Sequence, residues 1–268
     1  MPPLPVLLYH AVNDDPPDWL APYTVSRRTF ADQLDALLAS GRTPVTAGQI
    51  AAARTGGPPL PDHAVAVTFD DGYLDFLCHA LPALAGRAIP VTLFVTTGAL
   101  APYNRSLLPD AAMLTLGEIV RLDAVGVEIG AHTHLHPQLD TLHPSAAAWE
   151  LTHSKDILEQ ALGHEITLTA YPHGYSSRPV RDLARDIGYR AAFAVRDALS
   201  PEADDPYRIA RLTVKADTPP AKFEAWLSGT GAPVAGARER ALTLGWRCYR
   251  RALAYLPRPS SADPAESR

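Results

Sequence analysis

Short apolar runs alternate with longer amphipathic stretches through most of this 268-residue chain. Compact runs rich in β-branched residues predict strands at residues 6–10, 44–46, 65–69, 91–95, 127–130, 166–171, 191–195 and 209–214. Apolar spacing of three and four predicts helices at residues 26–40, 47–54, 76–86, 115–125, 144–162 and 180–187. Repeated strand–helix units of this length indicate an α/β fold with parallel strands, either a barrel or a doubly wound sheet. In both architectures the functional residues gather at the carboxyl ends of the strands.

Length and charge narrow the classes of protein to which the chain can belong. Its 28.8 kDa suit one barrel-sized domain or two small domains, and we favour one domain. A net charge of −5 and a pI near 6.0 argue against nucleic acid as a partner. The two cysteines, Cys78 and Cys248, match no metal-ligand spacing, so we expect reduced thiols. The apolar run at the start of the chain is too short for a signal peptide or a membrane span, and we therefore expect a cytoplasmic protein.

Two adjacent carboxylates, Asp70 and Asp71, follow the strand at residues 65–69 and precede Gly72. Side by side they repel each other, and beside an apolar strand they also lose hydration. A cation is the natural partner that keeps such a pair ionised, so the first hypothesis is a metal site. The alternative interpretation is an Asp-Gly turn with two solvated acids.

His132 and His136 follow the strand at residues 127–130 and lie four positions apart, which puts both imidazoles on one side of a tight loop. The alternative is a pair of histidines that face solvent. Both clusters stand at strand ends, however, and Asp71 would complete a set of three ligands with positions left for water. A Lewis-acidic ion lowers the pKa of such a water from 15.7 toward ~7, and Asp70 would remain as the base.

Three segments closely resemble motifs of the polysaccharide deacetylases, the carbohydrate esterases of family four, whose domain is also called the NodB-homology domain. They are residues 68–73 (TFDDGY), 132–137 (HTHLHP) and 170–174 (AYPHG), and the similarity covers about residues 4 to 227. The resemblance implies a distorted (β/α)7 barrel and metal-dependent removal of acetyl groups from an N-acetylated sugar. It also implies Asp70 as base, and Asp71, His132 and His136 as metal ligands. Thr133 would hold the metal loop, and the backbone N–H of His173 would help to bind the oxyanion.

The chain departs from the family pattern at two positions, the residue that orients the base and the residue that acts as general acid. Ala170 stands where the third motif usually has an arginine that orients the base, and the usual Leu-x-His near the end of the barrel is missing. We expect Arg208 or, preferably, Arg211 to replace the arginine, because an ionised base benefits from an opposite charge within ~4–6 Å.

The general acid must also come from elsewhere, because the leaving nitrogen of an amide has to be protonated. We expect a histidine at a strand end, either His10 or His173, with a slight preference for His10. Two alternatives remain open: His10 could be a structural residue, or solvent could supply the proton.

The carboxyl-terminal part differs in composition from the barrel. We assign residues 1–230 to a catalytic barrel, residues 231–256 to an Arg-rich helical segment whose helix starts near residue 234, and residues 257–268 to a disordered tail. The helix could bind a membrane surface or a partner. Alternatively, it packs on the barrel with its arginines facing water.

The sequence therefore predicts a metal-dependent N-deacetylase that acts on a sugar in a polysaccharide, a glycolipid or a small glycoside. One alternative is hydrolysis of a non-sugar amide or a cyclic imide on the same scaffold. Another is a non-catalytic carbohydrate-binding protein, although all four residues of the metal and base set are present. Ligands of the Asp-His-His type suit Zn first, and also Co, Ni or Mn.

Overall fold

Seven parallel strands close into a barrel in the computed structural model, which describes residues 3–102, 104–236 and 241–255. The strands of the ring are β1 (Val6–Tyr9), β5 (Ala64–Phe69), β6 (Val91–Val95), β7 (Glu128–Ala131), β8 (Leu168–Ala170), β9 (Ala191–Val195) and β10 (Ile209–Thr213). They follow the order β1-β10-β9-β8-β7-β6-β5, and β5 pairs back onto β1 from Val6↔Ala66 to Tyr9↔Phe69. The predicted (β/α)7 barrel is therefore confirmed.

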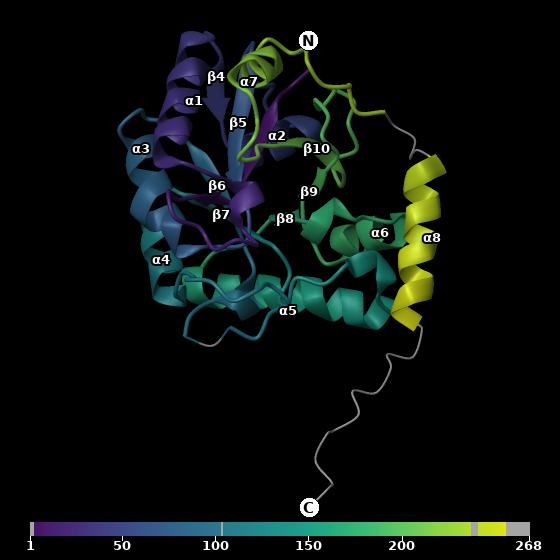
Figure 1. Ribbon diagram of the computed structural model, residues 1–268. Coiled ribbons are helices and arrows are strands. Elements are labelled where there is room, and N and C mark those ends of the chain that lie inside the picture. Colours follow the sequence, from purple (N-terminus) through teal and green to yellow (C-terminus); the bar gives the residue numbers. More distant parts are fainter. Residues whose placement is uncertain (1–2, 103, 237–240, 256–268) are drawn as a thin grey trace, which may run out of the picture. The chain divides into compact units, whose positions relative to one another are not determined.

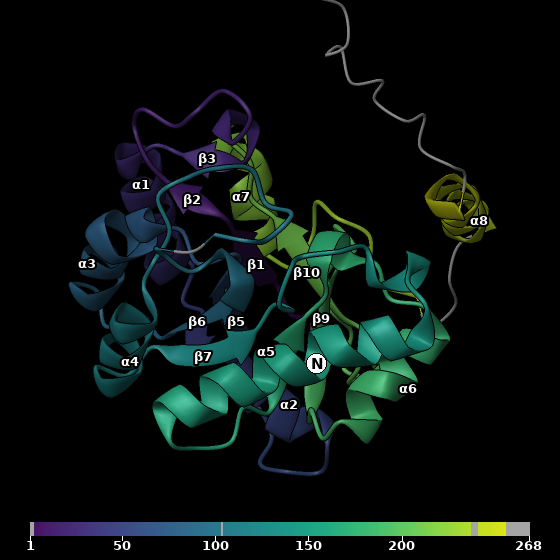
Figure 2. The ribbon, with the colours of Figure 1, turned by 90° about the horizontal axis from the view of Figure 1, so that it is seen from below.

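Helices surround the ring of strands (Figures 1 and 2). They are α1 (Arg27–Ala39), α3 (Leu81–Ala85), α4 (Leu116–Ala124), α5 (Pro144–Leu162), α6 (Arg178–Asp186) and α7 (Pro220–Leu227). Short 3-10 turns lie at Ala21–Tyr23, Thr97–Ala99, Leu139–Thr141 and Pro172–Gly174. The helix ends follow local chemistry: the Ser26 side chain caps α1 by accepting the Thr29 N–H, and Gly163 ends α5 in the left-handed conformation.

Alternation along the strands separates two hydrophobic layers. One set of side chains fills the barrel interior and includes Ala66, Phe94, Phe193 and Ile209. The alternate positions, such as Val67 on β5, face the outer helices. Full burial of one large apolar side chain stabilises the fold by ~1.5–3 kcal/mol, so this double layer supplies much of the driving force for folding.

The amino end of the barrel is closed by α2 (Ala47–Arg54), which follows β4 (Thr43–Val45), a strand paired with the first half of β5. Glu128, at the start of β7, accepts hydrogen bonds from the Thr46 hydroxyl and the Gly48 N–H, both at 2.9 Å. The opposite end carries a small two-stranded sheet of β2 (Ala11–Val12) and β3 (Thr24–Val25). The amino end is thus packed, and the carboxyl ends of the strands stay accessible.

Two helical segments differ from the sequence prediction. The helix expected at residues 76–86 starts as a π-helix, Phe76–Ala80, before α3. Pro82 has no N–H and its ring would clash with the carbonyl four residues earlier, so regular α-helical bonding cannot pass through it. Helix α7 was not predicted, although Pro220 at its first turn and the spacing of Phe223, Trp226 and Leu227 are typical of a helix.

The carboxyl-terminal helix α8 spans Ala241–Tyr255, so the expected start near residue 234 is wrong. Val234 instead forms a bridge with Leu199, and the Ala235 N–H donates to the Leu199 carbonyl at 2.9 Å. On α8 itself, the half-exposed rings of Trp246 and Tyr249 stack at 5.3 Å between centroids. The predicted tail, residues 257–268, lies outside the described residues. Within the described ranges, every helix is too short or too polar to cross a membrane.

Candidate active site

A cavity of 390 Å³ opens at the carboxyl ends of the strands. The predicted site residues that line it are His10, Asp70, Asp71, His132, His136 and His173. They follow four different strands, β1, β5, β7 and β8. The barrel therefore brings together residues that lie up to 163 positions apart, because parallel strands end at one edge.

Both carboxylates after β5 face this cavity because the backbone reverses at Asp71. Asp70 continues the interior-facing series of Ala66 and Thr68, so strict alternation would point Asp71 outward. Asp71 adopts a left-handed conformation (φ 73°), which a non-glycine residue rarely takes, and Gly72 follows at φ 95°. The Asp71 carbonyl also accepts the Thr96 N–H at 3.2 Å. This turn places two buried acids side by side.

The loop after β7 carries His132 and His136 through two further left-handed residues, Thr133 (φ 63°) and His136 (φ 62°). The Thr133 hydroxyl accepts the His136 N–H at 3.1 Å, so Thr133 holds the loop as expected. The His132 ring donates through Nδ1 to the Ala170 carbonyl at 2.8 Å, which leaves Nε2 unprotonated and turned toward the acids.

The ligand atoms of Asp71, His132 and His136 all lie within 4.8 Å of one another. Asp71 Oδ1 is 3.6 Å from His132 Nε2 and 3.3 Å from His136 Nε2. Two ligand atoms that each sit ~2.1 Å from one tetrahedral zinc lie ~3.4 Å from each other. Asp71 Oδ1 is buried and has no hydrogen-bond partner within the described part of the chain. The three groups therefore fit a divalent metal.

Both histidines of this group are neutral at neutral pH. Burial lowers the pKa of His132 to about 4, against the attraction of Asp70. Burial also lowers the pKa of His136 to about 3, and His173 adds to the effect. Neutral imidazole is the form that binds metal, so neither ring has to lose a proton first.

Asp70 is held by Arg211, the residue that we preferred over Arg208. Arg211 Nη1 and Nη2 donate to the two Asp70 oxygens at 2.6 and 2.7 Å, and the Arg211 side chain is 0% exposed. Burial raises the pKa of Asp70, but the charge and hydrogen bonds of Arg211, together with the nearby His132 and His10, outweigh burial and hold that pKa at about 2. Arg208 instead donates to the Gly236 carbonyl at 3.0 Å.

The two candidate acids, His10 and His173, both line the cavity but sit in different surroundings. The His10 ring packs 5.3 Å from Tyr23, and its Nδ1 is buried without a hydrogen-bond partner among the residues that the structure describes. His173 is exposed, left-handed (φ 58°) and 4.9 Å from the His136 ring. Both histidines therefore lie at the cavity. The preference for His10 as the general acid stays a prediction.

Several residues of the cavity wall were not predicted from the sequence. Asp197 and Lys215 line the cavity and follow the ends of β9 and β10. Functional residues of such barrels gather after the strands, so these two residues could have been predicted from their positions. The Asp197 carboxylate accepts the Thr213 N–H at 3.1 Å. An aromatic side is formed by Trp19, Tyr23 and Tyr73. Trp19 and Tyr23 come from the loop between β2 and β3, which carries no comparable signal.

The fold and the cavity define an α/β-barrel protein that assembles carboxylates and histidines at the carboxyl ends of parallel strands. A family model described as polysaccharide deacetylase matches residues 57–192, half of the chain. The chain belongs to the polysaccharide deacetylase family. His10 and Arg211 lie outside the matched residues.

Three relatives agree with this assignment. YxkH of Bacillus subtilis, which is named for the same family, is 22% identical over 224 residues, 84% of this chain and 76% of YxkH. The solved structure of IcaB from Ammonifex degensii is 28% identical, has a TM-score of 0.72, and matches over 87% of this chain and 98% of IcaB. The poly-beta-1,6-N-acetyl-D-glucosamine N-deacetylase of Escherichia coli K12 is 41% identical over 76 residues, 28% of this chain and 11% of that protein. Family membership supports a hydrolytic deacetylase.

Proposed function

We propose that the protein is a metal-dependent N-deacetylase that hydrolyses the acetamido group of N-acetylglucosamine units in a glycan. The observation that carries the proposal is the convergence of Asp71, His132 and His136 beside the Arg211-bound carboxylate of Asp70. Asp71, His132 and His136 would hold the divalent ion, with Zn the first choice. When bound, such an ion polarises a carbonyl oxygen and lowers the pKa of water.

Asp70 is the proton acceptor of the proposed reaction. Each carboxylate oxygen has two lone pairs, and Arg211 uses one on each oxygen. Asp70 Oδ2 lies 3.6 Å from His132 Nε2 and therefore borders the ligand cluster with a lone pair to spare. A low pKa keeps Asp70 ionised at neutral pH, so it can take one proton from the attacking water.

The second proton must reach the nitrogen as the C–N bond breaks. The water oxygen then stays on the acetyl carbon, and acetate and an amine are the products. We assign the donation to His10 first and to His173 second, because both line the cavity and a histidine can be protonated near neutral pH. The backbone N–H of His173 is the proposed donor to the oxyanion.

The cavity wall suits a sugar ring. Trp19 and Tyr73 lie 6.2 Å apart between ring centroids on the aromatic side, where the apolar face of a pyranose could stack. Asp197 and Lys215 supply groups for hydroxyls. The Escherichia coli relative is named for a β-1,6-linked N-acetylglucosamine polymer, which makes that linkage the first substrate to test.

The test measures acetate released by zinc-loaded protein from β-1,6- and β-1,4-linked N-acetylglucosamine oligomers and from a non-sugar N-acetyl amide. We expect acetate from at least one oligomer, none after chelation, and release that is slower by ~10²–10⁴-fold from Asp70→Asn. If the zinc-loaded protein releases acetate from the non-sugar amide alone, the sugar assignment is wrong.

A further inference from the structure

Glu150 is a buried carboxylate behind the proposed metal site, and the reaction described above does not use it. It lies on α5, is 4% exposed, and faces the loop that carries His132 and His136. Its Oε2 atom accepts the backbone N–H groups of His134 at 2.9 Å and Leu135 at 2.8 Å. One oxygen thus binds two consecutive amides between the two histidine ligands.

The loop needs this acceptor because its backbone is irregular. Thr133 and His136 are both left-handed, so residues 133–136 form neither a helix nor a strand. The amides of His134 and Leu135 face α5 and require a partner from outside the loop. Buried N–H groups without an acceptor are costly, and Glu150 removes that cost for both.

The other side of the loop is held by the backbone after β6. The Gly98 N–H donates to the His134 carbonyl at 2.8 Å, and the Thr97 N–H donates to the Thr133 carbonyl at 3.3 Å. A Cβ atom at Gly98 would lie 2.5 Å from the His134 carbonyl oxygen, so the contact is close. Backbone therefore secures one side of the loop, and the side chain of Glu150 secures its two amides on the other.

We propose that Glu150 is a positioning residue that sets the geometry of the His132–His136 loop and thereby the affinity for the metal. The inference rests on the proposed function, because it presumes that these histidines bind a cation. In this proposal the metal affinity depends on the length of the Glu150 side chain, which lets one oxygen accept both amides, and does not depend on its negative charge. Residues that orient metal ligands typically change metal affinity by ~10–100-fold when they are altered.

Two conservative variants separate the effect of the length of the Glu150 side chain from the effect of its charge. Glu150→Gln keeps an oxygen at the same reach and removes the charge, whereas Glu150→Asp keeps the charge and shortens the side chain by one methylene. Glu159→Asp is the matched control, because Glu159 lies on the same helix and also accepts a backbone N–H, that of Ile166 at 2.8 Å. It does so away from the metal loop.

The experiment measures the Zn²⁺ dissociation constant of each metal-free protein by chelator competition, and hydrogen exchange at the amides of residues 134 and 135. We expect Glu150→Asp to bind Zn²⁺ ~10–100-fold more weakly and to exchange both amides faster, whereas Glu150→Gln and Glu159→Asp stay within about threefold of wild type. Circular dichroism checks that each variant is folded.

Wild-type affinity in Glu150→Asp would overturn the inference, and so would weak binding in Glu150→Gln, because the charge of Glu150 would then matter. Either result would leave the proposed function intact. Failure of the wild-type protein to bind Zn²⁺ would instead contradict the proposed function itself.

Discussion

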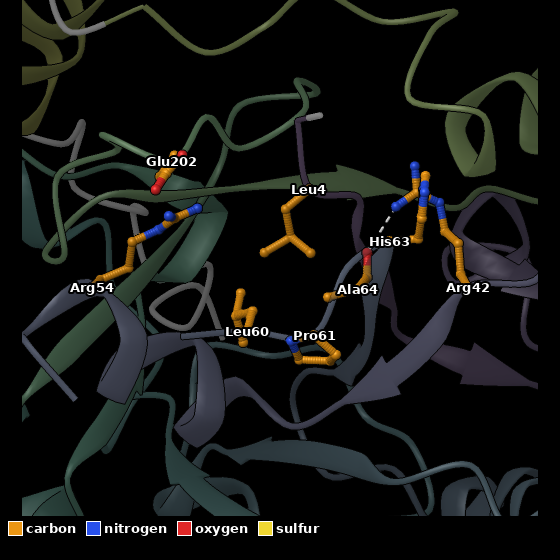
Figure 3. Close-up of a pocket in the computed structure, with 8 residues that line it drawn as sticks. All are labelled: Leu4, Arg42, Arg54, Leu60, Pro61, His63, Ala64 and Glu202. Carbon is orange, nitrogen blue, oxygen red and sulfur yellow. Dashed lines mark hydrogen bonds between the residues drawn. The ribbon is translucent and has the colours of Figure 1, made fainter. Parts of the chain in front are cut away.

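The two ends of the barrel differ in the size of their cavities and in the polar atoms that line them. At the amino end a cavity of only 30 Å³ is lined by residues that include Arg42, Arg54 and Glu202 (Figure 3). Arg42 there donates from Nη1 to the Ala64 carbonyl at 2.8 Å and from Nε to the Leu227 carbonyl, whereas Arg54 Nε is buried without a hydrogen-bond partner in the described ranges. At the carboxyl end the cavity measures 390 Å³, and Asp71 Oδ1 and His10 Nδ1 are buried without hydrogen-bond partners in the described ranges.

Left-handed residues other than glycine are more frequent at the carboxyl end. Among the described residues, Asp71, Thr133, His136, His173 and Asp197 lie there, whereas His63 and Ala88 lie at the amino end. Such conformations cost ~1–3 kcal/mol each and persist only where the surrounding structure enforces them. The larger cavity and the greater number of left-handed residues indicate that the carboxyl end is shaped for a ligand, whereas the packed amino end contributes mainly to stability. Substitutions at the carboxyl end should therefore affect activity most, and substitutions at the amino end should mainly affect stability.

Loss of a metal ligand should have the largest effect. His136→Ala removes one of three ligand atoms, so zinc stoichiometry should fall and acetate release should drop by more than ~10⁴-fold. Zinc content and activity are measured on the same sample, and circular dichroism should show an intact fold. Full zinc content in this variant would remove His136 from the ligand set.

Asp70→Asn should bind zinc normally and fail in turnover. An amide cannot accept the proton as a carboxylate does, so the rate should fall by ~10²–10⁴-fold. Comparison of zinc affinity with the rate of acetate release checks both halves of the expectation. A variant that keeps a near wild-type rate would show that Asp70 is not the base.

Arg211→Lys should lower activity by ~10²-fold, because an ammonium group cannot form the two parallel hydrogen bonds that hold Asp70. Burial raises the pKa of Asp70 and Arg211 lowers it, so weakening this contact should move the acidic limb of kcat/KM to higher pH. The pH–rate profile of Arg211→Lys against that of wild type measures the shift. An unmoved acidic limb would contradict the role of Arg211.

Much of this site could be predicted from local sequence. Asp70 and His132 stand directly after apolar runs, Asp71 and His136 follow shortly after them, and parallel strands bring such positions to one edge. The family pattern also places them within matched residues 57–192. The contact between Arg211 and Asp70 is harder to predict from local sequence, because it joins β10 to the end of β5 across the barrel interior. Alternation along β10 groups Arg211 with Thr213 but does not say which face meets the interior.

Other features depend on the assembled fold. The Asp71-Gly72 pair marks a turn, but the local sequence does not show that this turn points both carboxylates into the cavity. Trp19 reaches the cavity from a loop whose path is set by packing with distant segments. The start of the carboxyl-terminal helix was misplaced because pairing of Val234 with Leu199 overrides local helical tendency.

The general acid should be revealed by the alkaline limb of the pH–rate profile. His10→Ala should lose that limb and ~10–10²-fold in rate while zinc stays bound, because solvent can partly replace the donor. His173→Ala is the matched comparison, since it also removes a cavity-lining histidine. If only His173→Ala loses the limb, the acid is His173; if both variants keep it, neither histidine donates the proton.

At the amino end, a substitution should lower stability and leave activity within about twofold. Glu128→Ala removes the acceptor for the Thr46 hydroxyl, the Gly48 N–H and, at 2.5 Å, the Thr92 hydroxyl. We expect the free energy of unfolding to fall by ~1–3 kcal/mol, measured by urea denaturation, because these donors lose a charged partner. His136→Ala should behave in the reverse way, with lost activity and little lost stability of the metal-free protein. A large activity loss in Glu128→Ala at unchanged stability would mean that the two ends of the barrel are not separate in function.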